Sequence, residues 1–425
     1  MRKDEEKMIK VMETFSGIGA QAKALSRQDE EYEIVATADW DVNAIIAYDI
    51  IHHGTPNIEP YEGMPREEVI EKLSQYTLSP DGKDPYKGES LKRVNEQFQR
   101  YLLAAIERSN NLGSITDMTY EDIPENLDVL TYSFPCQNLS LAGVWRGELT
   151  GIDRDADNRS GMLWEVERIL MECEEHNRRL PRFLLMENVS NILSARHKDN
   201  FEEWKSYLNK IGYENVVYKL DASKFGVPQI RKRVFMISIY VGNDARKIEL
   251  VNNYITDHDL ENENYVNEII NHRLTVRDII KNDYTVEKYH FEALNSQMNN
   301  TPSREKIVQE NRHLFKNNQY ENYIRTVTTK QDRNPNSGVV QFENEKSGKL
   351  NWRYLTPREC FLSMGFDEED YEALMEHNVK ITKSRYLFSD SKLIKMAGNS
   401  IVVNVLEAIF HQIIELKEIL QENDE

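Results

Sequence analysis

Short apolar runs alternate with segments of helical spacing over the first half of the chain. The runs at residues 9–15, 32–38, 129–132, 183–186, 215–219 and 234–241 have the length and bounding turns of buried strands. Helical spacing appears between them, at residues 20–25, 163–171 and 201–211. Strands that alternate with helices predict a doubly wound α/β sheet, and we extend its parallel arrangement to about residue 243.

The pattern changes after Asn243. From there to about Gly348 the chain is rich in Asn, Asp, Glu and Tyr and has no clear periodicity, which predicts a smaller, irregular domain. Residues 393–425 return to a strong helical pattern. Residues 91–106, within an insertion between His52 and Asn111, also have helical spacing and are expected to cover the sheet. We therefore assign residues 1–245 and 393–425 to one domain, and residues 246–392 to a second domain and its hinge.

Composition favours a protein of a reducing compartment. The three cysteines are an odd, sparse set without metal-ligand spacing, so neither a disulfide framework nor a metal site is predicted. No run approaches the roughly 18 apolar residues of a membrane helix, and no secretory segment precedes residue 9. We expect a cytoplasmic protein without a membrane partner.

Net charge at first argues against a nucleic-acid partner. The chain has 53 Lys and Arg against 72 Asp and Glu, a net charge of −19, and carboxylates repel a polyanion. However, residues 301–336 hold seven basic and four acidic side chains, so this stretch is locally positive. DNA therefore stays open as a partner.

A glycine turn follows the first predicted strand. Phe15, Gly17 and Gly19 lie between that strand and a helix, where backbone N–H groups can approach a ligand closely. Asp39 follows 20 residues after Gly19, and a carboxylate there can accept from ribose hydroxyls. Sites for NAD, FAD and S-adenosylmethionine all begin in this way, and a plain tight turn is an equal alternative. Trp40 either packs on an adenine or is a core aromatic.

A cysteine and a glutamate end two later strands. Cys136 lies in a Pro-containing loop after residues 129–132, where active sites of α/β proteins occur, although most single cysteines are buried fillers. Glu187 ends the next strand and can act as an acid, or it is a solvated residue or a helix cap. Arg231 and Arg233 precede another strand, and alternation sends both to one face, as a site or as a surface basic patch.

Five motifs occur in the order typical of bacterial DNA cytosine-5 methyltransferases, and the chain resembles that family over residues 9–241 and 353–410. Residues 353–360 with Gly365 and Phe366 also look like the family's segment before its last motif. The resemblance implies a Rossmann-like methyltransferase domain with a smaller target-recognition domain. The motifs are residues 15–19, 135–137, 187–189, 229–233 and 398–400.

The resemblance also implies a mechanism. Cys136 would add to carbon 6 of a flipped cytosine, so that carbon 5 takes a methyl group from S-adenosylmethionine. Glu187 would hold or donate the proton at ring nitrogen 3. Arg233 would bond the carbonyl oxygen of the base, and Arg231 would position the Cys136 loop.

The cofactor pocket is implied in the same way, with one departure from the family pattern. Phe15 and Trp40 would contact the adenine, Asp39 the ribose, and Asn399 and Ser400 would complete the pocket with the glycine turn. The family often has an Asp before Ile in its third motif, whereas Ser114 occupies that place here and accepts hydrogen bonds more weakly.

About 110 residues lie between the arginine motif and Arg353, where the family has its target-recognition domain. Residues 324–328 resemble a Thr-Leu-Thr landmark of that domain, with Val in place of Leu. Polar side chains of this kind can read base edges. An Asn-rich solvated loop is the alternative for part of the segment. We predict DNA contacts from Gln137, Arg325, Thr326 and Thr328.

The leading hypothesis is a monomeric DNA cytosine-5 methyltransferase that uses S-adenosylmethionine on a specific double-stranded sequence, with a restriction endonuclease as a separately acting partner. One alternative is an RNA cytosine-5 methyltransferase of the same fold, which the long segment before Arg353 disfavours. A catalytically inactive DNA-binding relative is disfavoured by the intact Cys136, Glu187 and Arg233. A nucleotide-dependent oxidoreductase explains Asp39 but leaves the Cys136 loop without a role.

Overall fold

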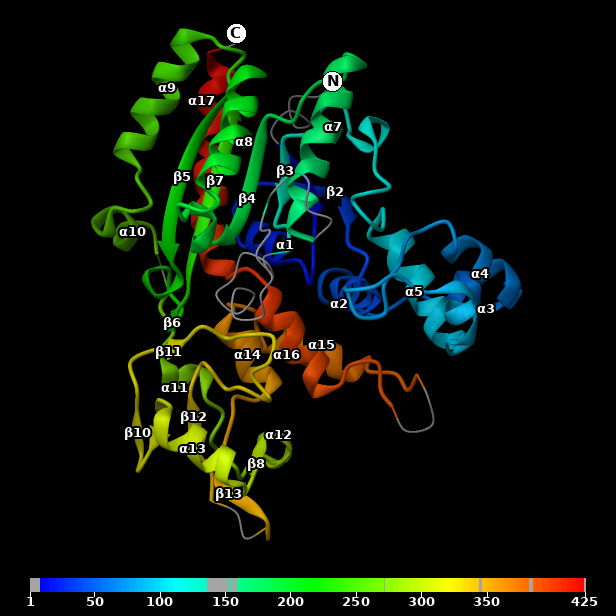
Figure 1. Ribbon diagram of the computed structural model, residues 1–425, viewed down its shortest axis with the longest axis vertical. Coiled ribbons are helices and arrows are strands. Elements are labelled where there is room, and N and C mark those ends of the chain that lie inside the picture. Colours follow the sequence, from blue (N-terminus) through cyan, green and yellow to red (C-terminus); the bar gives the residue numbers. More distant parts are fainter. Residues whose placement is uncertain are drawn as a thin grey trace.

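The computed structural model describes residues 8–135, 152, 154, 159–270, 272–343, 346–381 and 385–423. A six-stranded sheet lies at the centre of its larger part (Figure 1). The strand order is β2-β1-β3-β4-β7-β5. The bounds are β1 Ile9–Thr14, β2 Tyr32–Ala38, β3 Val129–Tyr132, β4 Phe183–Val189, β5 Tyr213–Asp221 and β7 Lys232–Tyr240.

The sheet is mixed rather than parallel throughout. Strands β1 to β4 pair in parallel, but β7 runs antiparallel to both β4 and β5. Our prediction of parallel pairing to residue 243 is therefore wrong for β7. Only the short helix η5 (Ala222–Lys224) and strand β6 (Gln229–Ile230) lie between β5 and β7. Because a parallel return needs a crossover of a dozen or more residues, this short connection forces the antiparallel pairing.

The central strands are buried on both faces, which explains their continuous apolar runs. Successive side chains point to opposite sides, so Val11 and Val129 enter one core while Met12 and Leu130 enter the other. The first core includes helices α1 (Ala20–Leu25), α2 (Val42–His53), α5 (Glu96–Arg108) and α17 (Val403–Glu422). The second includes α7 (Leu163–Glu175) and α8 (Lys198–Lys210). Helices on both faces confirm the doubly wound α/β class.

Helix α17 connects the C-terminal end of the chain to its first strand. It packs against α1 and against α9 (Ala245–Asp257). The buried Lys417 ammonium lies 2.9 Å from the Asp128 carboxylate and donates to the Met8 carbonyl. Residues Asp390–Glu422 are long and apolar enough to cross a membrane, but 72% of their apolar window is buried inside the protein. This segment is therefore core structure here.

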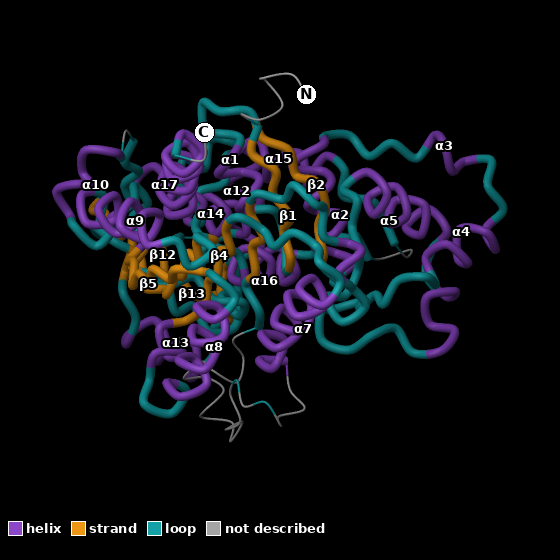
Figure 2. Tube along the Cα trace, turned by 90° about the horizontal axis from the view of Figure 1, so that it is seen from above, coloured by secondary structure: helices purple, strands orange, loops and turns teal. Residues whose placement is uncertain are grey.

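The insertion after α2 forms a helical projection. It contains α3 (Glu59–Glu62), α4 (Arg66–Leu73) and η1 (Gly88–Arg93), and leads into α5. Figures 1 and 2 both show α3 and α4 extending to one side of the sheet. Helix α5 packs against α2 and α4. This confirms helical structure within residues 91–106, while their predicted place over the sheet stays a prediction.

A second, five-stranded sheet occupies the lower part of Figure 1. Its order is β10-β9-β12-β13-β8, and its strands have two to five residues each, too short for a periodic pattern. Their bounds are β8 Gln297–Asn299, β9 His313–Lys316, β10 Gln319–Tyr320, β12 Val339–Gln341 and β13 Lys349–Arg353. Around them lie α11 (Val276–Ile279), α12 (Glu287–Asn295) and α13 (Pro302–Glu310).

Several elements join the two parts. Strand β11 (Ile324–Arg325) pairs in parallel with β6. Helix α14 (Pro357–Ser363) packs on α16 (Asp390–Asn399), and α15 (Glu368–Glu376) packs on α2. The other short helices are α10 (Glu263–Ile269), η2 (Tyr120–Asp122), η3 (Arg159–Met162) and η4 (Ser190–Leu193). The division of the chain at residues 246 and 392 stays a prediction.

Candidate active site

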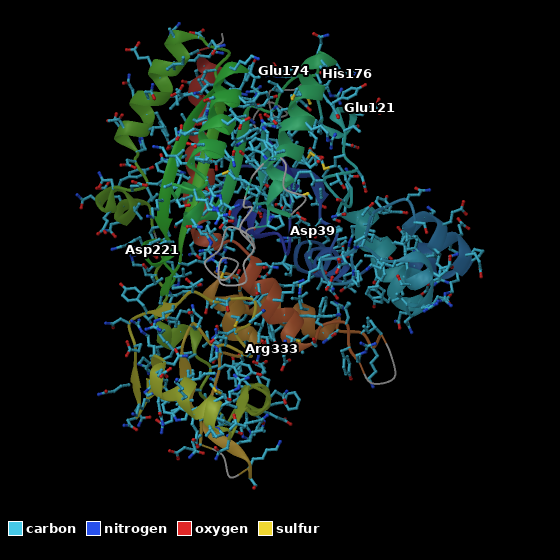
Figure 3. The ribbon with its side chains drawn as sticks, viewed as in Figure 1. Asp39, Glu121, Glu174, His176, Asp221 and Arg333 are labelled. Carbon is cyan, nitrogen blue, oxygen red and sulfur yellow. The ribbon has the colours of Figure 1, made fainter. Side chains whose placement is uncertain are left out.

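A cavity of about 380 Å³ opens at the carboxyl ends of β1 to β4, the usual position of a ligand site in an α/β sheet. Its volume lies in the range of small-molecule sites. Figure 3 labels Asp39 at this edge of the sheet. Ten of the residues predicted from sequence line the cavity: Phe15, Gly17, Asp39, Trp40, Ser114, Glu187, Arg231, Arg233, Asn399 and Ser400.

The turn after β1 has a strained backbone. Phe15 adopts a φ of 55°, in the left-handed region that a side chain disfavours, and Gly17 and Gly19 have φ values of 56° and 77°. Strain of this kind persists only where the surrounding structure enforces it, and it concentrates at functional sites. The turn brings the Phe15 side chain and the Gly17 backbone to the cavity wall.

Gly19 is not among the residues that line the cavity, and its assignment to the cofactor stays a prediction. A Cβ atom at Gly19 would lie 2.1 Å from His52 Nε2 and 2.7 Å from Tyr48 Cε2. Burial lowers the pKa of His52 to about 4, so the ring is neutral, and its Nε2 donates to the Ile18 carbonyl at 3.0 Å. Gly19 therefore allows α2 to pack against the turn.

Asp39 is held by the backbone on both sides. Its Oδ2 accepts from the Gly17 N–H at 2.9 Å, and its Oδ1 accepts from the Asp41 N–H at 2.8 Å. Burial and the neighbouring Asp41 carboxylate raise the pKa of Asp39 to about 6, against the opposing effect of these N–H groups and Lys395. Each oxygen retains a second lone pair, so Asp39 can still accept from a ligand.

Three further residues complete this end of the cavity. The Ser114 hydroxyl lies 2.7 Å from that of Thr116. Helix α16 ends at Asn399, and the Ser400 hydroxyl donates to the Ile401 carbonyl at 3.1 Å. These positions bring the C-terminal motif next to the turn of the first strand.

Glu187 and Arg233 form an ion pair on neighbouring strands. Glu187 lies on β4, Arg233 on β7, and Arg233 Nε is 3.2 Å from Glu187 Oε1. Burial raises the pKa of Glu187 above its ordinary value, although Arg233 and Arg231 act in the opposite direction. A raised pKa favours the protonated carboxyl, which is the form that can act as an acid.

Arg231 connects three separate segments from a buried position between β6 and β7. Its Nη1 donates to the Val327 carbonyl at 3.0 Å. Its Nη2 donates to the carbonyls of Gly398 at 3.2 Å and Ser400 at 2.9 Å. The side chain therefore holds the C-terminal motif and the segment after β11 against the strand that carries Arg233.

Cys136 and Gln137 lie outside the described residues. Pro135, which precedes Cys136, lines the cavity. The buried Asn188 amide donates to the Phe134 carbonyl at 3.2 Å and so fixes the chain just before Pro135. Sequence reasoning missed this role, although the position of Asn188 directly after Glu187 was the available signal.

The cavity wall also contains residues that sequence reasoning missed. Thr77, Gly82 and Lys83 come from the insertion, and Lys395 comes from α16. The insertion carries no motif, so no pattern in it pointed to a ligand. A lysine on a helix is most often a solvated residue, and only the tertiary structure places Lys395 here.

Of the predicted DNA-contact residues, the three that the structure describes, Arg325, Thr326 and Thr328, are not among the residues that line the cavity. Arg325 is exposed on β11. Thr326 donates its hydroxyl to the Ile230 carbonyl at 2.9 Å. A Cβ atom on Gly398 would lie 2.5 Å from both the Thr328 carbonyl carbon and the Thr329 nitrogen, so this glycine allows the segment to approach α16.

Comparisons with known proteins agree with this arrangement. The family model for C-5 cytosine-specific DNA methylases matches residues 92–415. The chain belongs to this family. The orphan methyltransferase M.SssI of Spiroplasma monobiae is 33% identical over 413 residues, which cover 96% of this chain and 98% of the relative. The type II methyltransferase M2.ScrFI of Lactococcus lactis subsp. cremoris is 30% identical over 412 residues, covering 96% and 99%.

A solved structure shares the fold of this DNA methylase. The S. pombe Dnmt2 methyltransferase superposes with a TM-score of 0.57 at 17% sequence identity, covering 96% of this chain and 98% of that chain. Family membership confirms that the protein is a DNA cytosine-5 methyltransferase. The oxidoreductase alternative is thereby set aside.

The two glycines of the turn should respond differently to alanine. Gly19→Ala should lower the free energy of unfolding by about 3 kcal/mol, because its methyl group meets the His52 ring in a left-handed backbone. The methyl group added by Gly17→Ala would have no atom within 4 Å. This variant should therefore lower the free energy of unfolding by only about 1 kcal/mol, through backbone strain, and should mainly weaken ligand binding. Denaturant unfolding and calorimetry measure the two effects. The reverse order of stability loss would contradict these assignments.

Proposed function

We propose that this methyltransferase moves a methyl group from S-adenosylmethionine to carbon 5 of a flipped cytosine in a specific double-stranded DNA sequence, through a covalent bond between Cys136 and carbon 6. The observation that carries the proposal is the shared cavity. One wall contains Asp39, Trp40 and the glycine turn, and another contains Glu187 with Arg233. A cofactor and a base in this cavity would face each other.

The residues of the first wall fit S-adenosylmethionine. The ring of Phe15 or Trp40 suits an adenine, and the lone pairs of Asp39 suit ribose hydroxyls. Ser114, Asn399 and Ser400 supply further polar groups, while the exposed face of Gly17 leaves space for the ligand. When bound, the cofactor supplies an electrophilic methyl group.

The residues of the second wall fit a cytosine out of the helix. In the proposed step the Cys136 thiolate bonds to carbon 6, and the electron pair of the 5,6 double bond becomes available at carbon 5. Protonated Glu187 would hold or donate the proton at ring nitrogen 3, which accepts the displaced charge. Arg233 would donate to the ring carbonyl oxygen. After carbon 5 has taken the methyl group, loss of its proton and of the thiolate restores the ring and the free cysteine.

Arg231 would act on this reaction through other groups. It donates to carbonyls of the C-terminal motif and of the segment after β11. We propose that it positions these walls around the base, and that Gln137, Arg325, Thr326 and Thr328 contact DNA in a domain of residues 246–392. Arg325 is the strongest candidate for reading a base, because it is exposed while Thr326 already donates to Ile230.

The wider setting is also a proposal. We infer a cytoplasmic enzyme that acts as a monomer on DNA. One relative is named an orphan methyltransferase and another a type II methyltransferase. The second name supports a restriction endonuclease that acts separately on the same sequence.

Substitution of Cys136 tests the covalent step. DNA with 5-fluorocytosine at the target should trap the enzyme covalently, since fluorine cannot leave as a proton does. Cys136→Ser should abolish trapping and turnover, because a hydroxyl is far less ionised than a thiol near neutral pH. Denaturing electrophoresis and mass spectrometry detect the adduct.

Cys173 and Cys360 are matched controls for this experiment. Both are buried, and burial raises the pKa of the Cys173 thiol to about 11 and that of Cys360 well above its usual value. Their alanine variants should still be trapped wherever they remain folded. An adduct on either residue, or wild-type methylation by Cys136→Ser, would contradict the mechanism.

Substitution of Glu187 tests the acid. Glu187→Gln keeps the shape but cannot transfer a proton, so kcat should fall by about 10²- to 10⁴-fold while cofactor affinity is retained. Burial raises the pKa of Glu187, so wild-type activity should fall as the pH rises through this raised pKa. The Gln variant should lack this fall. Single-turnover rates across pH provide the measurement. Glu214→Gln, at a half-buried position on β5, is the control. An unchanged kcat in Glu187→Gln would exclude the role.

Substitution of Arg325 tests DNA recognition. If its guanidinium reads a base, Arg325→Ala should weaken the binding free energy for the target DNA sequence by about 1–3 kcal/mol. The loss on other sequences should be smaller. Cofactor affinity should not change. Filter binding over a series of salts and sequences gives these values, with the exposed Arg246→Ala on α9 as control. An equal loss on all sequences would indicate a phosphate contact instead.

A further inference from the structure

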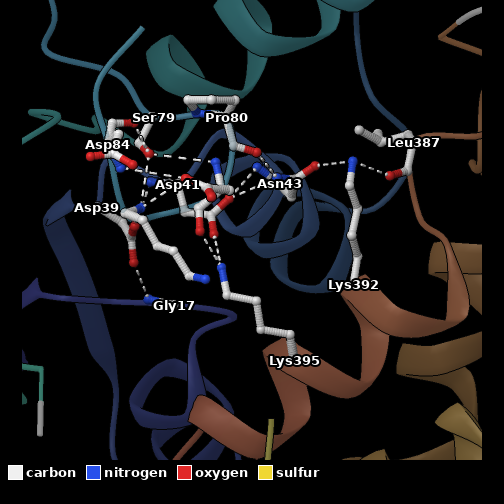
Figure 4. Close-up of polar contacts among 12 residues, drawn as sticks. Gly17, Asp39, Asp41, Asn43, Ser79, Pro80, Asp84, Leu387, Lys392 and Lys395 are labelled. Atoms are coloured by element: carbon white, nitrogen blue, oxygen red, sulfur yellow. Dashed lines mark hydrogen bonds and ion pairs between the residues drawn. The ribbon is translucent and has the colours of Figure 1, made fainter. Parts of the chain in front are cut away.

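A loop of the insertion, residues 77–84, reaches the edge of the cavity. Thr77, Gly82 and Lys83 form part of the wall, on the same side as Asp39 and Asp41. Figure 4 shows this loop beside the end of β2 and the start of α2. The insertion is therefore part of the cavity wall.

Hydrogen bonds hold the loop against the residues that follow Asp39. The Ser79 N–H donates to the Trp40 carbonyl at 2.6 Å, and the Val42 N–H donates to the Ser79 carbonyl at 3.0 Å. The Asn43 amide donates to the Pro80 carbonyl at 2.9 Å. A Cβ atom on Gly82 would lie 2.8 Å from Asp41 Oδ2, so the loop approaches Asp41 as closely as a glycine allows.

Lys395 joins this loop to the C-terminal motif. Its ammonium lies 2.9 Å from Asp41 Oδ2 and also donates to the Asp81 carbonyl (Figure 4). The side chain is about three-quarters buried, with 27% exposed, and it lines the same cavity. Lys395 lies on α16, four residues before Asn399, so one cation connects α16, the start of α2 and the insertion.

We infer that Lys395 is a positioning residue for the cofactor: it holds the insertion loop and Asp41 at the ribose end of the cavity. This inference rests on the proposed use of S-adenosylmethionine and extends it. It assigns the insertion to the cofactor pocket rather than to DNA recognition. It also gives the cofactor affinity a defined dependence on pH.

The charges around Asp39 support that dependence. Asp41 lies two residues after Asp39 and Lys395 lies on α16, and Figure 4 labels both with Asp84 of the insertion loop. Asp81 and Lys83 belong to the same loop. Burial and Asp41 raise the pKa of Asp39 to about 6, and Lys395 lowers it. The ionised carboxylate is the better acceptor for ribose hydroxyls. The affinity for the cofactor should therefore reach its full value above this pKa and should fall as the pH falls through it.

The test is calorimetric titration of S-adenosylmethionine and of its demethylated product into the full-length enzyme from about pH 5 to about pH 9. Wild-type affinity should fall with a midpoint near pH 6. Lys395→Met should weaken binding, most strongly below the wild-type midpoint, and should move the midpoint upward, because Lys395 is one of the groups that lower the pKa of Asp39. Lys395→Arg keeps the charge and should restore the wild-type midpoint.

Lys392→Met is the matched control, because Lys392 also joins α16 to α2. It donates to Asn43 Oδ1 at 2.7 Å and to the Leu387 carbonyl at 2.9 Å, and it does not line the cavity. Its loss should leave the midpoint unchanged. An unchanged midpoint in folded Lys395→Met, or an equal shift in Lys392→Met, would overturn this inference alone. Failure of the wild-type enzyme to bind either ligand at any pH would overturn the proposed cofactor and this inference with it.

Discussion

The arrangement of the site depends on the buried guanidinium of Arg231. This guanidinium donates hydrogen bonds to the carbonyls of Val327, Gly398 and Ser400. These residues lie 96, 167 and 169 positions after Arg231 in the sequence. A buried cation is costly unless its donors are satisfied, so the three carbonyls must converge for this side chain to be accommodated. Their convergence brings the C-terminal motif and the β11 segment to the strand of Arg233. One arginine thereby couples the wall proposed for the cofactor to the wall proposed for the base.

Burial raises the pKa of two carboxyl groups in the cavity. Asp39 and Glu187 both have raised pKa values, but their surroundings differ. Asp39 accepts two backbone hydrogen bonds and is held beside Lys395, which favour its ionised form. Glu187 has no backbone donor among the causes of its shift, and its opposing influences are Arg233 and Arg231. Two carboxyls in one cavity therefore have different surroundings, with backbone donors at Asp39 and guanidinium groups at Glu187.

Much of this site could be predicted because the chemistry lies at strand ends. Apolar runs identified every strand of the larger sheet. The residues that follow parallel strands meet at one edge, and Asp39 and Glu187 both line the cavity there. The antiparallel course of β7 was missed, although the short connection after β5 contained the information. The short strands of the smaller sheet have too few residues to show a period. The insertion loop and Lys395 were missed because their contacts with Asp41 are tertiary and leave no local pattern. Gly19 was assigned to the ligand, but the constraint on it comes from His52.

The central claim is that one cavity brings a methyl donor to carbon 5 of a cytosine in DNA. Incubation of the purified protein with genomic DNA and labelled S-adenosylmethionine, followed by sequencing that maps methylcytosine, tests this most directly. The account predicts label on carbon 5 of cytosine within one short, defined sequence and none on RNA. Label on adenine, label on RNA cytosine alone, or no transfer to DNA by folded enzyme would contradict it.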